Sequence, residues 1–538
     1  MARSDTPRGR LAMTPEKRAG LCVLSGTLLA AAFPKLGFAP FAWVALVPLL
    51  FAIDGAGMAA VIIYGWIQGF VFFACSLYWI VIVLTGFAHK PIMIAVGTLA
   101  LLAAVEAGFV AVAIGGAEFV SRRLGISRLV SFPVAWVSME WLRSFFPIGF
   151  PWNLLGAALY RELRIIQFAE FTGVYGVSAL IVFVNVAFWT MVSARPSRVQ
   201  KVRAAWSLAV VFAIVFGFGA IRVNQLDRAP SAGTLRVGII QANIPQSMKW
   251  NPASLPANFK IYSDATLAAA KEDPDVIIWP ETATGFFFQP LNAYPGALAR
   301  DSEYWTHLAD LAKQIKLPIL FGAPAIDIVG RDIATRNRAY VITRGGYVDK
   351  YYDKIELVPV AEYVPGPLRG HINRIVEGLR DFRPGDRQTI FQIGTARVAA
   401  LICYEGIFPY LARRSAQAGA NILVNITNDA WFGRSSAPYQ LLAMTVMRAI
   451  ENRTPIVRVA NTGISAVISP TGRIIGATDL FTRTTEIETV AWNNERTAYT
   501  RFGDVFAWAC FGFLLATLAL AFVQRSLRCA FGKRRKQE

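Results

Sequence analysis

The chain has 538 residues, a hydrophobic fraction of 55%, a mean hydropathy of +0.43 and a formal net charge of +19. This apolar content excludes an ordinary soluble protein, and the length allows several domains. The basic residues form no run interleaved with aromatic residues in the polar part of the chain, which argues against nucleic-acid binding. They lie beside apolar stretches instead.

Apolar stretches fill the first part of the chain and return near its end. A membrane span needs about 20 mostly apolar residues. Eight segments are candidates, near residues 20–32, 41–53, 58–84, 92–119, 129–146, 171–192, 204–223 and 505–523. The second is short enough to be re-entrant. We predict a transmembrane bundle of seven spans over residues 20–223 and a final transmembrane helix over residues 504–524.

The distribution of Lys and Arg predicts the orientation of these spans, because cytoplasmic loops collect basic residues. The tails 1–19 and 525–538 and the connections 121–128 and 193–203 together hold eighteen basic residues, whereas the opposite set of connections holds five. Both basic tails are therefore predicted to be cytoplasmic. Residues 224–500 are then on the other side, which in a bacterium is the periplasm. A cleavable signal peptide is the alternative for the first span, but it would leave the charge pattern unexplained.

Ionisable residues within predicted spans need a partner or a water-filled cavity. Glu140 and Arg143 are three residues apart and share a helical face, so we predict a structural ion pair between them. Glu106 and Glu170 also lie in or beside spans. A role in substrate binding is the alternative for Glu140 or Arg143.

Residues 224–500 have the pattern of an α/β domain, in which short β-branched runs alternate with helix-length segments. The predicted strands are 235–241, 276–279, 318–321, 339–343, 398–403, 422–426, 456–459 and 464–468. The predicted helices are 257–271, 302–316 and 439–452, with a further helix after Pro409. Gly345-Gly346 and Pro470-Thr471-Gly472 predict hairpin turns.

Several kinds of chemistry lack support in the sequence. The glycine motifs that bind phosphate groups or dinucleotides are missing, and the three histidines, His89, His307 and His371, are scattered. We therefore expect neither a cofactor nor a metal, nor a Ser-His-Asp mechanism. Cys403 is the only cysteine in the polar part, where an oxidising compartment would leave it as an unpaired thiol.

Three chemically suitable side chains follow predicted strands. Trp279-Pro280-Glu281 ends one strand, Lys354 follows Tyr352-Asp353, and Cys403 ends another strand. A nucleophilic thiol needs a base to take its proton and a positive group to favour the thiolate, which Glu281 and Lys354 supply. Lys354 and the backbone N–H of Tyr404 are candidates to stabilise an oxyanion. Each residue alone is more typical of core or surface, so the prediction depends on their joint occurrence.

The motifs around these residues resemble a known superfamily. W-P-E at 279–281, Lys354 ahead of L-V-P-x-x-E-Y-V-P, and C-Y-E at 403–405 resemble the Glu-Lys-Cys hydrolases of the nitrilase superfamily. With N-D-A-W-F-G at 428–433, G-F-P-W at 149–152 and the predicted spans, the resemblance narrows to the apolipoprotein N-acyltransferase family. It extends over nearly the whole chain. The sequence departs from the family at Val360-Ala361, where Phe-Gly is more usual, so the shape of that loop is in doubt.

The resemblance implies a nitrilase-like α-β-β-α sandwich on an eight-span transmembrane bundle, in the bacterial inner membrane, with the active site facing the periplasm. Cys403 would take an acyl chain from a phospholipid as a thioester. The α-amino group of the diacylglyceryl-cysteine of an apolipoprotein would then receive that chain as an amide, the final step of lipoprotein maturation. Glu281 would act as general base, and Lys354 would stabilise both tetrahedral intermediates. We expect a monomer that needs no metal and binds no nucleic acid.

Five further residues match family positions around the three catalytic candidates. Glu362 and Glu405 are expected to orient Lys354 or the substrate head group, with structural pairing as the alternative. Asn337 is expected to hold the Lys354 region. Tyr404 and Trp431 are expected to contact acyl chains, with core packing as the alternative.

A run of three phenylalanines, residues 286–288, follows Glu281. It is predicted to form an apolar lip at the acyl entrance, with core burial as the alternative. Two other functions remain open on the sequence alone. One is a membrane-tethered nitrilase-like amidohydrolase, because the three catalytic candidates do not determine whether water or an amine resolves the acyl-enzyme. The other is a membrane protein with a degenerate sensor or assembly domain.

Overall fold

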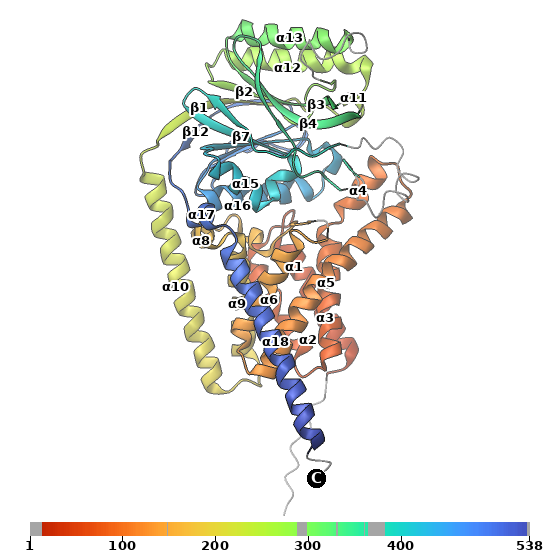
Figure 1. Ribbon diagram of the computed structural model, residues 1–538, viewed down its shortest axis with the longest axis vertical. Helices are drawn as coiled ribbons and strands as arrows, with labels where there is room; N and C mark the ends of the chain where they lie inside the picture. The colour runs from red at the N-terminus through yellow and green to blue at the C-terminus, as the bar shows by residue number, and fades with distance from the viewer. Residues whose placement is uncertain are drawn as a thin grey trace, which may run out of the picture.

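The computed structural model describes residues 13–147, 149–287, 299–329, 332–359, 361–363 and 382–534. It consists of a helical part and an α/β part that lie one above the other (Figure 1). Phe288, Val360, His371, residues 1–12 of the N-terminal basic tail and the last four residues of the C-terminal one lie outside the described residues. The predicted boundary near residue 224 falls close to the place where the last helix of the bundle leads into the first strand.

Within the described ranges, five helices are long and apolar enough to cross a membrane. They are α3 (Met58–Ser76), α5 (Ile92–Leu124), α9 (Val174–Val192), α10 (Arg198–Arg228) and α18 (Val505–Arg534). The remaining predicted spans form shorter or more charged helices, which are α1 (Pro15–Ala32), the 3-10 helix η1 (Ala39–Trp43) followed by α2 (Val47–Ile53), and α6 (Arg128–Arg143).

The predicted continuous span at 58–84 is wrong, because the helix ends after α3 and a second helix follows. The second piece is a separate helix, α4 (Trp79–Gly86), which contacts the 3-10 helix η6 (Asp429–Phe432) of the α/β part. The Tyr78 hydroxyl accepts a hydrogen bond from the Ser436 backbone N–H at 3.1 Å. The chain turns here because α4 packs against the α/β part rather than continuing through the bundle.

Helix α10 lies along one side of the helical part, where it contacts α9, and leads upward into the α/β part (Figure 1). Only 11% of its most apolar 18-residue window is buried within the protein. Trp206 is 68% exposed and Ile214 64%. A long helix that is apolar on its exposed faces is stable only in an apolar surrounding, which favours contact with lipid.

Arg143 pairs with a different carboxylate from the predicted one. Its Nη1 lies 3.4 Å from Oε2 of Glu106 on α5, and it also donates to the Trp152 carbonyl at 3.0 Å. Glu140 instead accepts the Leu155 backbone N–H at 2.7 Å. The predicted Glu140–Arg143 pair is therefore wrong, because each side chain satisfies backbone groups of the loop that follows α6.

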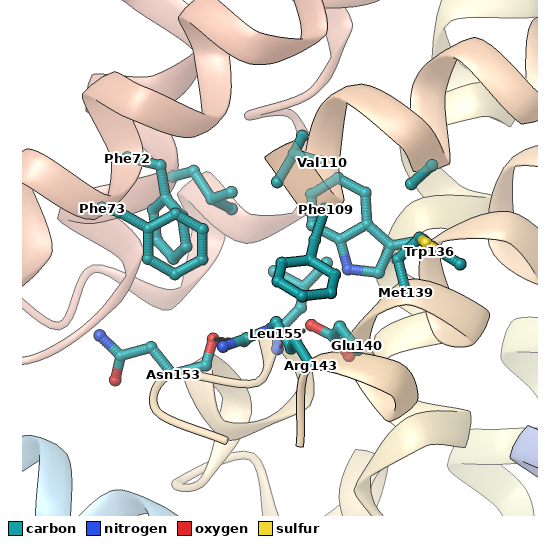
Figure 2. A pocket seen from close by; sticks show the side chains of 12 residues that line it. Phe72, Phe73, Phe109, Val110, Trp136, Met139, Glu140, Arg143, Asn153 and Leu155 are labelled. Carbon is teal, nitrogen blue, oxygen red and sulfur yellow. Dashed lines mark hydrogen bonds between the residues drawn. The ribbon is translucent and has the colours of Figure 1, made fainter. Parts of the chain in front are cut away.

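A small cavity lies at this polar cluster inside the helical part. Figure 2 shows Phe72 and Phe73 on one side of it and Trp136 and Met139 on the other, while Arg143 and Glu140 lie at its lower edge. The wall is apolar, and the two charged side chains lie at one edge. That edge adjoins the loop after α6, because Arg143 donates to the Phe150 carbonyl at 2.9 Å.

The α/β part contains two six-stranded sheets. The first has the order β12-β1-β2-β3-β4-β5, with β1 Gly233–Gln241, β2 Val276–Ile278, β3 Ile319–Val329, β4 Asp332–Ile342, β5 Val348–Asp353 and β12 Thr484–Trp492. The second has the order β11-β10-β9-β8-β7-β6, with β6 Ile390–Ile393, β7 Ala396–Ile402, β8 Ile422–Thr427, β9 Ile456–Ala460, β10 Ala466–Ile468 and β11 Ile474–Ile475.

Four layers result from these sheets and their helices. Helices α12 (Leu255–Ala270) and α13 (Ala299–Ile315) cover the first sheet, and α15 (Pro409–Gln417) and α16 (Ala437–Asn452) lie between the second sheet and the helical part (Figure 1). A core of alternate residues from both sheets fills the space between them. The predicted α-β-β-α sandwich is confirmed.

The predicted strands and both hairpin turns are present in the α/β part. The Gly346 N–H donates to the Thr343 carbonyl at 2.8 Å, and the Gly472 N–H donates to the Ser469 carbonyl at 2.9 Å. The prediction missed β5, β6, β11 and β12, which include the edge strands of both sheets. Edge strands carry more polar residues than central ones, so they lack the continuous apolar run that identified the others.

Ion pairs join the α/β part to the helical part. Arg453, which is 1% exposed and follows α16, donates to Glu170 at 2.8 Å. Glu170 belongs to the short helix α8 (Ala169–Thr172) and also pairs with Arg222 of α10 at 3.0 Å. One buried carboxylate therefore connects α8, α10 and the end of α16.

Substitution of Arg453 is expected to weaken this connection strongly. Arg453→Ala would leave Glu170 buried with one charged partner fewer, which costs about 3 kcal/mol or more. The surface pair Arg473–Asp227 is the matched control, and Arg473→Ala should change stability by no more than about 0.5 kcal/mol. Thermal unfolding of both purified variants measures the difference. Equal losses in the two variants would contradict the assigned role of Arg453.

Candidate active site

Glu281, Lys354 and Cys403 each lie just beyond a strand. Glu281 follows β2, Lys354 follows β5, and Cys403 begins the 3-10 helix η5 (Cys403–Ile407) directly after β7. Their exposed fractions are 6%, 1% and 8%. Because β2 and β5 belong to one sheet and β7 to the other, the two sheets together bring the three side chains to one buried site, where Glu281 and Lys354 both act on the Cys403 thiol.

Lys354 and Asn337 hold two carboxylates in a closed arrangement. Lys354 Nζ lies 3.4 Å from Glu281 Oε1 and 2.9 Å from Glu362 Oε1. Asn337 Nδ2 donates to the same two oxygen atoms, at 2.8 and 2.9 Å. Two donors therefore bridge two acceptors, so none of the four groups can turn independently of the others. This places the predicted Glu362 and Asn337 beside the predicted Lys354 and Glu281.

The second carboxylate oxygen of Glu281 is fixed from the other sheet. The Asn428 backbone N–H, just after β8, donates to Glu281 Oε2 at 2.9 Å. Burial alone would raise the pKa of Glu281, but the Lys354 ammonium, the Asn337 amide, the Lys249 ammonium and this backbone N–H outweigh burial and lower it. Glu281 is therefore ionised at neutral pH and able to accept a proton.

Cys403 is a protonated thiol in the resting site. Burial and the Glu281 carboxylate raise its pKa, and the opposing effect of the Lys354 ammonium is smaller. Burial lowers the pKa of Lys354, but the Glu362 and Glu281 carboxylates more than compensate, so the net shift is upward and Lys354 stays cationic. Attack by this thiol would therefore require a base in the same step, and the ionised Glu281 carboxylate is a proton acceptor in the same site.

The backbone at Cys403 is strained. Its φ is +51°, a left-handed conformation that residues with a side chain rarely adopt. Such strain costs about 1 to 3 kcal/mol and persists only where the surroundings impose it. The Asn425 side chain donates to the Cys403 carbonyl at 3.2 Å and to the Leu401 carbonyl at 3.1 Å. Arg458 Nη1 donates to Asn425 in turn, at 2.5 Å.

Glu405 supports the backbone on both sides of the pocket. It is fully buried and accepts from the Ile355 N–H at 2.6 Å, the Glu356 N–H at 3.1 Å, the Ile402 N–H at 2.6 Å and the Tyr352 hydroxyl at 2.8 Å. Burial raises its pKa to about 7, while these hydrogen bonds favour the ionised form. Glu405 thus joins the segment after the lysine to the strand before the cysteine.

The two predicted acyl-contacting aromatic residues lie in different surroundings. Tyr404 is 5% exposed; its hydroxyl donates to the Gly149 carbonyl at 3.3 Å, and its ring stacks on Trp152 of the helical part. This contact corresponds to the core-packing alternative. Trp431 is 41% exposed and contacts Phe87, just after α4. Trp431 therefore remains available to an apolar ligand at the boundary between the two parts.

The predicted phenylalanine lip is only partly described. Phe286 is 4% exposed and stacks on Tyr304 with a centroid separation of 5.1 Å, so this residue is buried. Phe288 lies outside the described residues. Sequence reasoning missed two contacts of Glu281. The Asn428 backbone lies within the motif at 428–433 and was identifiable from it, whereas Lys249 carries no local signal.

The strain at Cys403 predicts opposite effects of glycine at two cysteines. Glycine adopts φ = +51° without a side-chain clash, so Cys403→Gly should be more stable than Cys403→Ala by about 1 kcal/mol. At Cys22, buried within α1, Gly should be less stable than Ala by about 1 kcal/mol. Thermal unfolding of the four purified variants tests this. If Gly and Ala ranked the same way at both positions, Cys403 would not be strained.

Comparison with known proteins follows the same division of the chain. Residues 25–187 match the apolipoprotein N-acyltransferase N-terminal domain, and residues 236–498 match the carbon-nitrogen hydrolase family. A crystal structure of an amidase from Nesterenkonia sp. is 20% identical and covers 50% of this chain and 92% of that chain, with a TM-score of 0.36.

Full-length relatives are also similar. The apolipoprotein N-acyltransferase of Geobacter metallireducens is 39% identical over 516 residues, which cover 94% of this chain and 96% of that protein. The protein of the same name from Brucella melitensis is 34% identical over 431 residues, which cover 77% and 76% of the two chains. The similarity includes both the helical part and the α/β part. The chain belongs to the apolipoprotein N-acyltransferase family.

Proposed function

We propose that this chain transfers an acyl chain from a phospholipid to the α-amino group of an apolipoprotein, with Cys403 as the nucleophile. The observation that carries the proposal is a buried thiol in one pocket with an ionised carboxylate and an ammonium group, above a set of apolar helices. Glu281 is the general base, and Lys354 is the electrostatic stabiliser. Neither role requires a cofactor.

In the first step, Glu281 takes the Cys403 proton while the sulfur attacks an ester carbonyl of the phospholipid. Negative charge develops on the carbonyl oxygen, where the Lys354 ammonium and the Tyr404 backbone N–H stabilise it. The ester C–O bond then breaks, and the departing glycerol oxygen receives the proton from Glu281. The products are a thioester on Cys403 and a lysophospholipid.

In the second step, the free α-amino group of the diacylglyceryl-cysteine attacks the thioester carbonyl. Glu281 takes a proton from the attacking nitrogen, and Lys354 again stabilises the oxyanion. The C–S bond breaks, the departing sulfur receives the proton from Glu281, and the new bond is an amide. Water could also attack such a thioester and release a fatty acid. The catalytic side chains are buried, which limits the access of water and therefore favours transfer over hydrolysis.

The charge pattern and the apolar helices support a proposal for the placement of the site in the cell. We infer an eight-span bundle over residues 20–223 and 504–524 in the inner membrane, with α1, α6 and the broken segment 39–53 completing the five long helices. The basic tails favour a cytoplasmic position for both ends and a periplasmic one for residues 224–500. The enzyme then acts as a monomer on lipids of the outer leaflet.

Mass measurement of the cysteine peptide tests the chemistry. Purified protein incubated with phospholipid alone should gain the mass of one acyl chain on the Cys403 peptide, and a diacylated peptide with a free amine should remove it. Cys403→Ala should gain nothing, whereas Cys75→Ala, at an exposed cysteine of α3, should behave like the wild type. Release of free fatty acid without amide would favour an amidohydrolase. No adduct under any condition would favour a sensor or assembly domain.

Labelling from outside the cell tests the orientation. Lys313→Cys, exposed on α13, should react with a membrane-impermeant maleimide added to spheroplasts, because α13 is the layer farthest from the helical part. Arg195→Cys, exposed between α9 and α10, should react only after the membrane is permeabilised. Reaction of Arg195→Cys alone in intact spheroplasts would reverse the proposed orientation.

A further inference from the structure

A second lysine lies beside the catalytic candidates, and the mechanism above does not use it. Lys249 ends the short helix α11 (Gln246–Lys249) after β1 and is 2% exposed. Its Nζ donates to the main-chain carbonyl oxygen of Glu281 at 2.9 Å. Burying an ammonium group is costly, so a lysine in this position calls for a physical explanation.

The hydrogen bond from Lys249 falls at a strained turn. Thr282, the residue after Glu281, has a φ of +46°, again in the left-handed region. The opposite side of the same turn is also tightly packed. A Cβ atom added at Gly285 would lie only 2.4 Å from the Lys249 carbonyl oxygen. Segment 246–249 and the turn after Glu281 therefore fit against each other without spare room.

The same segment also reaches the other anchor of Glu281. Gln246 Oε1 accepts from the Asn428 side chain at 2.9 Å, and the Asn428 backbone N–H donates to Glu281 Oε2. Both ends of α11 thus contact groups that hold Glu281. One of these contacts carries a charge, and the other is neutral.

Among the residues that the structure describes, the site has more carboxyl groups than cations when Lys249 is left out. Four of these carboxyl groups come from the segments after β2, β5, β7 and β8. They are Glu281, Glu362, Glu405 and Asp429. Lys354 pairs with Glu281 and Glu362, and Arg458 pairs with Asp429 at 2.7 Å. A third cation is therefore electrostatically favourable here.

We propose that Lys249 is a positioning residue of this site, which holds the Glu281 main chain through its hydrogen bond and supplies a second positive charge to Glu281 and Cys403. The inference rests on the proposed function. Lys354 stabilises the reacting oxygen, whereas Lys249 acts through Glu281 and does not contact the acyl group.

The charge of Lys249 has a definite pH dependence. Burial lowers its pKa to about 7, although Glu281 and Cys403 both oppose that shift. Below pH 7 its ammonium favours the ionised form of Glu281, so the base remains available in more acidic solution. Above pH 7 Lys249 loses its charge, and Glu281, which is still ionised, binds a proton more strongly. Lys249 thus widens the pH range over which Glu281 accepts the thiol proton.

Substitutions at Lys249 separate its charge from its hydrogen bond. Lys249→Gln retains an N–H donor for the Glu281 carbonyl and removes the charge, Lys249→Arg retains the charge, and Lys249→Met removes both. The rate at which phospholipid acylates Cys403 is measured against pH by mass spectrometry. Lys249→Gln should move the acidic limb of this profile upward by about one pH unit, because a nearby positive charge lowers a carboxyl pKa by that amount or more. Lys249→Arg should keep the wild-type limb.

The surface variant Lys313→Met is the matched control and should leave the profile unchanged. If the acidic limb of the Lys249→Gln profile lies at the same pH as that of the wild type, the proposed electrostatic role is wrong. Lys249 would then have only a structural role, whatever the maximal rate of the variant. Lys249→Gln is the decisive variant, because Lys249→Met removes packing and charge together and is the one most prone to misfold.

A reagent that needs no lipid separates this inference from the proposed function. Methyl methanethiosulfonate modifies the Cys403 thiol directly. The positive charge of Lys249 also favours the Cys403 thiolate, so its loss should raise the pKa of that thiol. At about pH 6, Lys249→Gln should therefore react roughly tenfold more slowly than the wild type, which corresponds to a rise of about one unit in the thiol pKa. If phospholipid never acylates Cys403 but this difference is present, the proposed function fails and the role of Lys249 stands. Equal rates for the two proteins would contradict the role of Lys249.

Discussion

The bridge that Lys354 and Asn337 form between Glu281 and Glu362 is the interaction on which the site depends. It fixes one oxygen of each carboxylate, while the Asn428 backbone holds the second oxygen of Glu281 from the opposite sheet. Because the two sheets face each other, this contact fixes the position of one sheet relative to the other at the site. The base, the cation and the thiol are therefore positioned by the packing of the sandwich itself, and loop conformation plays a smaller part.

The same sandwich is joined to the helices below it by polar contacts as well as apolar packing. Trp152 donates to Gln440 of α16 at 2.8 Å, and the Val174 N–H donates to Glu451 at 2.9 Å. Tyr404, adjacent to the nucleophile, bonds to the loop at Gly149. The two parts thus share one continuous core, and the nucleophile turn rests directly on the helical part.

The central strands, both hairpin turns and the sandwich could be predicted, because buried β-branched runs and glycine turns are local signals. Glu281 and Cys403 were identifiable for the same reason, since each lies at or just after the end of a predicted strand. Lys354 follows β5, which the prediction missed, and was identified from the motif around it. Edge strands were missed because their polar residues lack such a run. The Glu106 partner of Arg143 and the contact from Lys249 could not be predicted, because both join segments that are distant in the sequence and depend on how separate elements pack.

Helix α16 shows what this shared core means for the α/β part on its own. All of its residues except Tyr439 are buried, since one side packs on the second sheet and the other on the helices below. Without the helical part, the side of α16 that now packs on those helices would be uncovered, and its apolar residues would form a sticky surface in water. Expression of residues 224–500 alone should therefore yield aggregates, because the sandwich ends in a layer that only its own membrane helices cover.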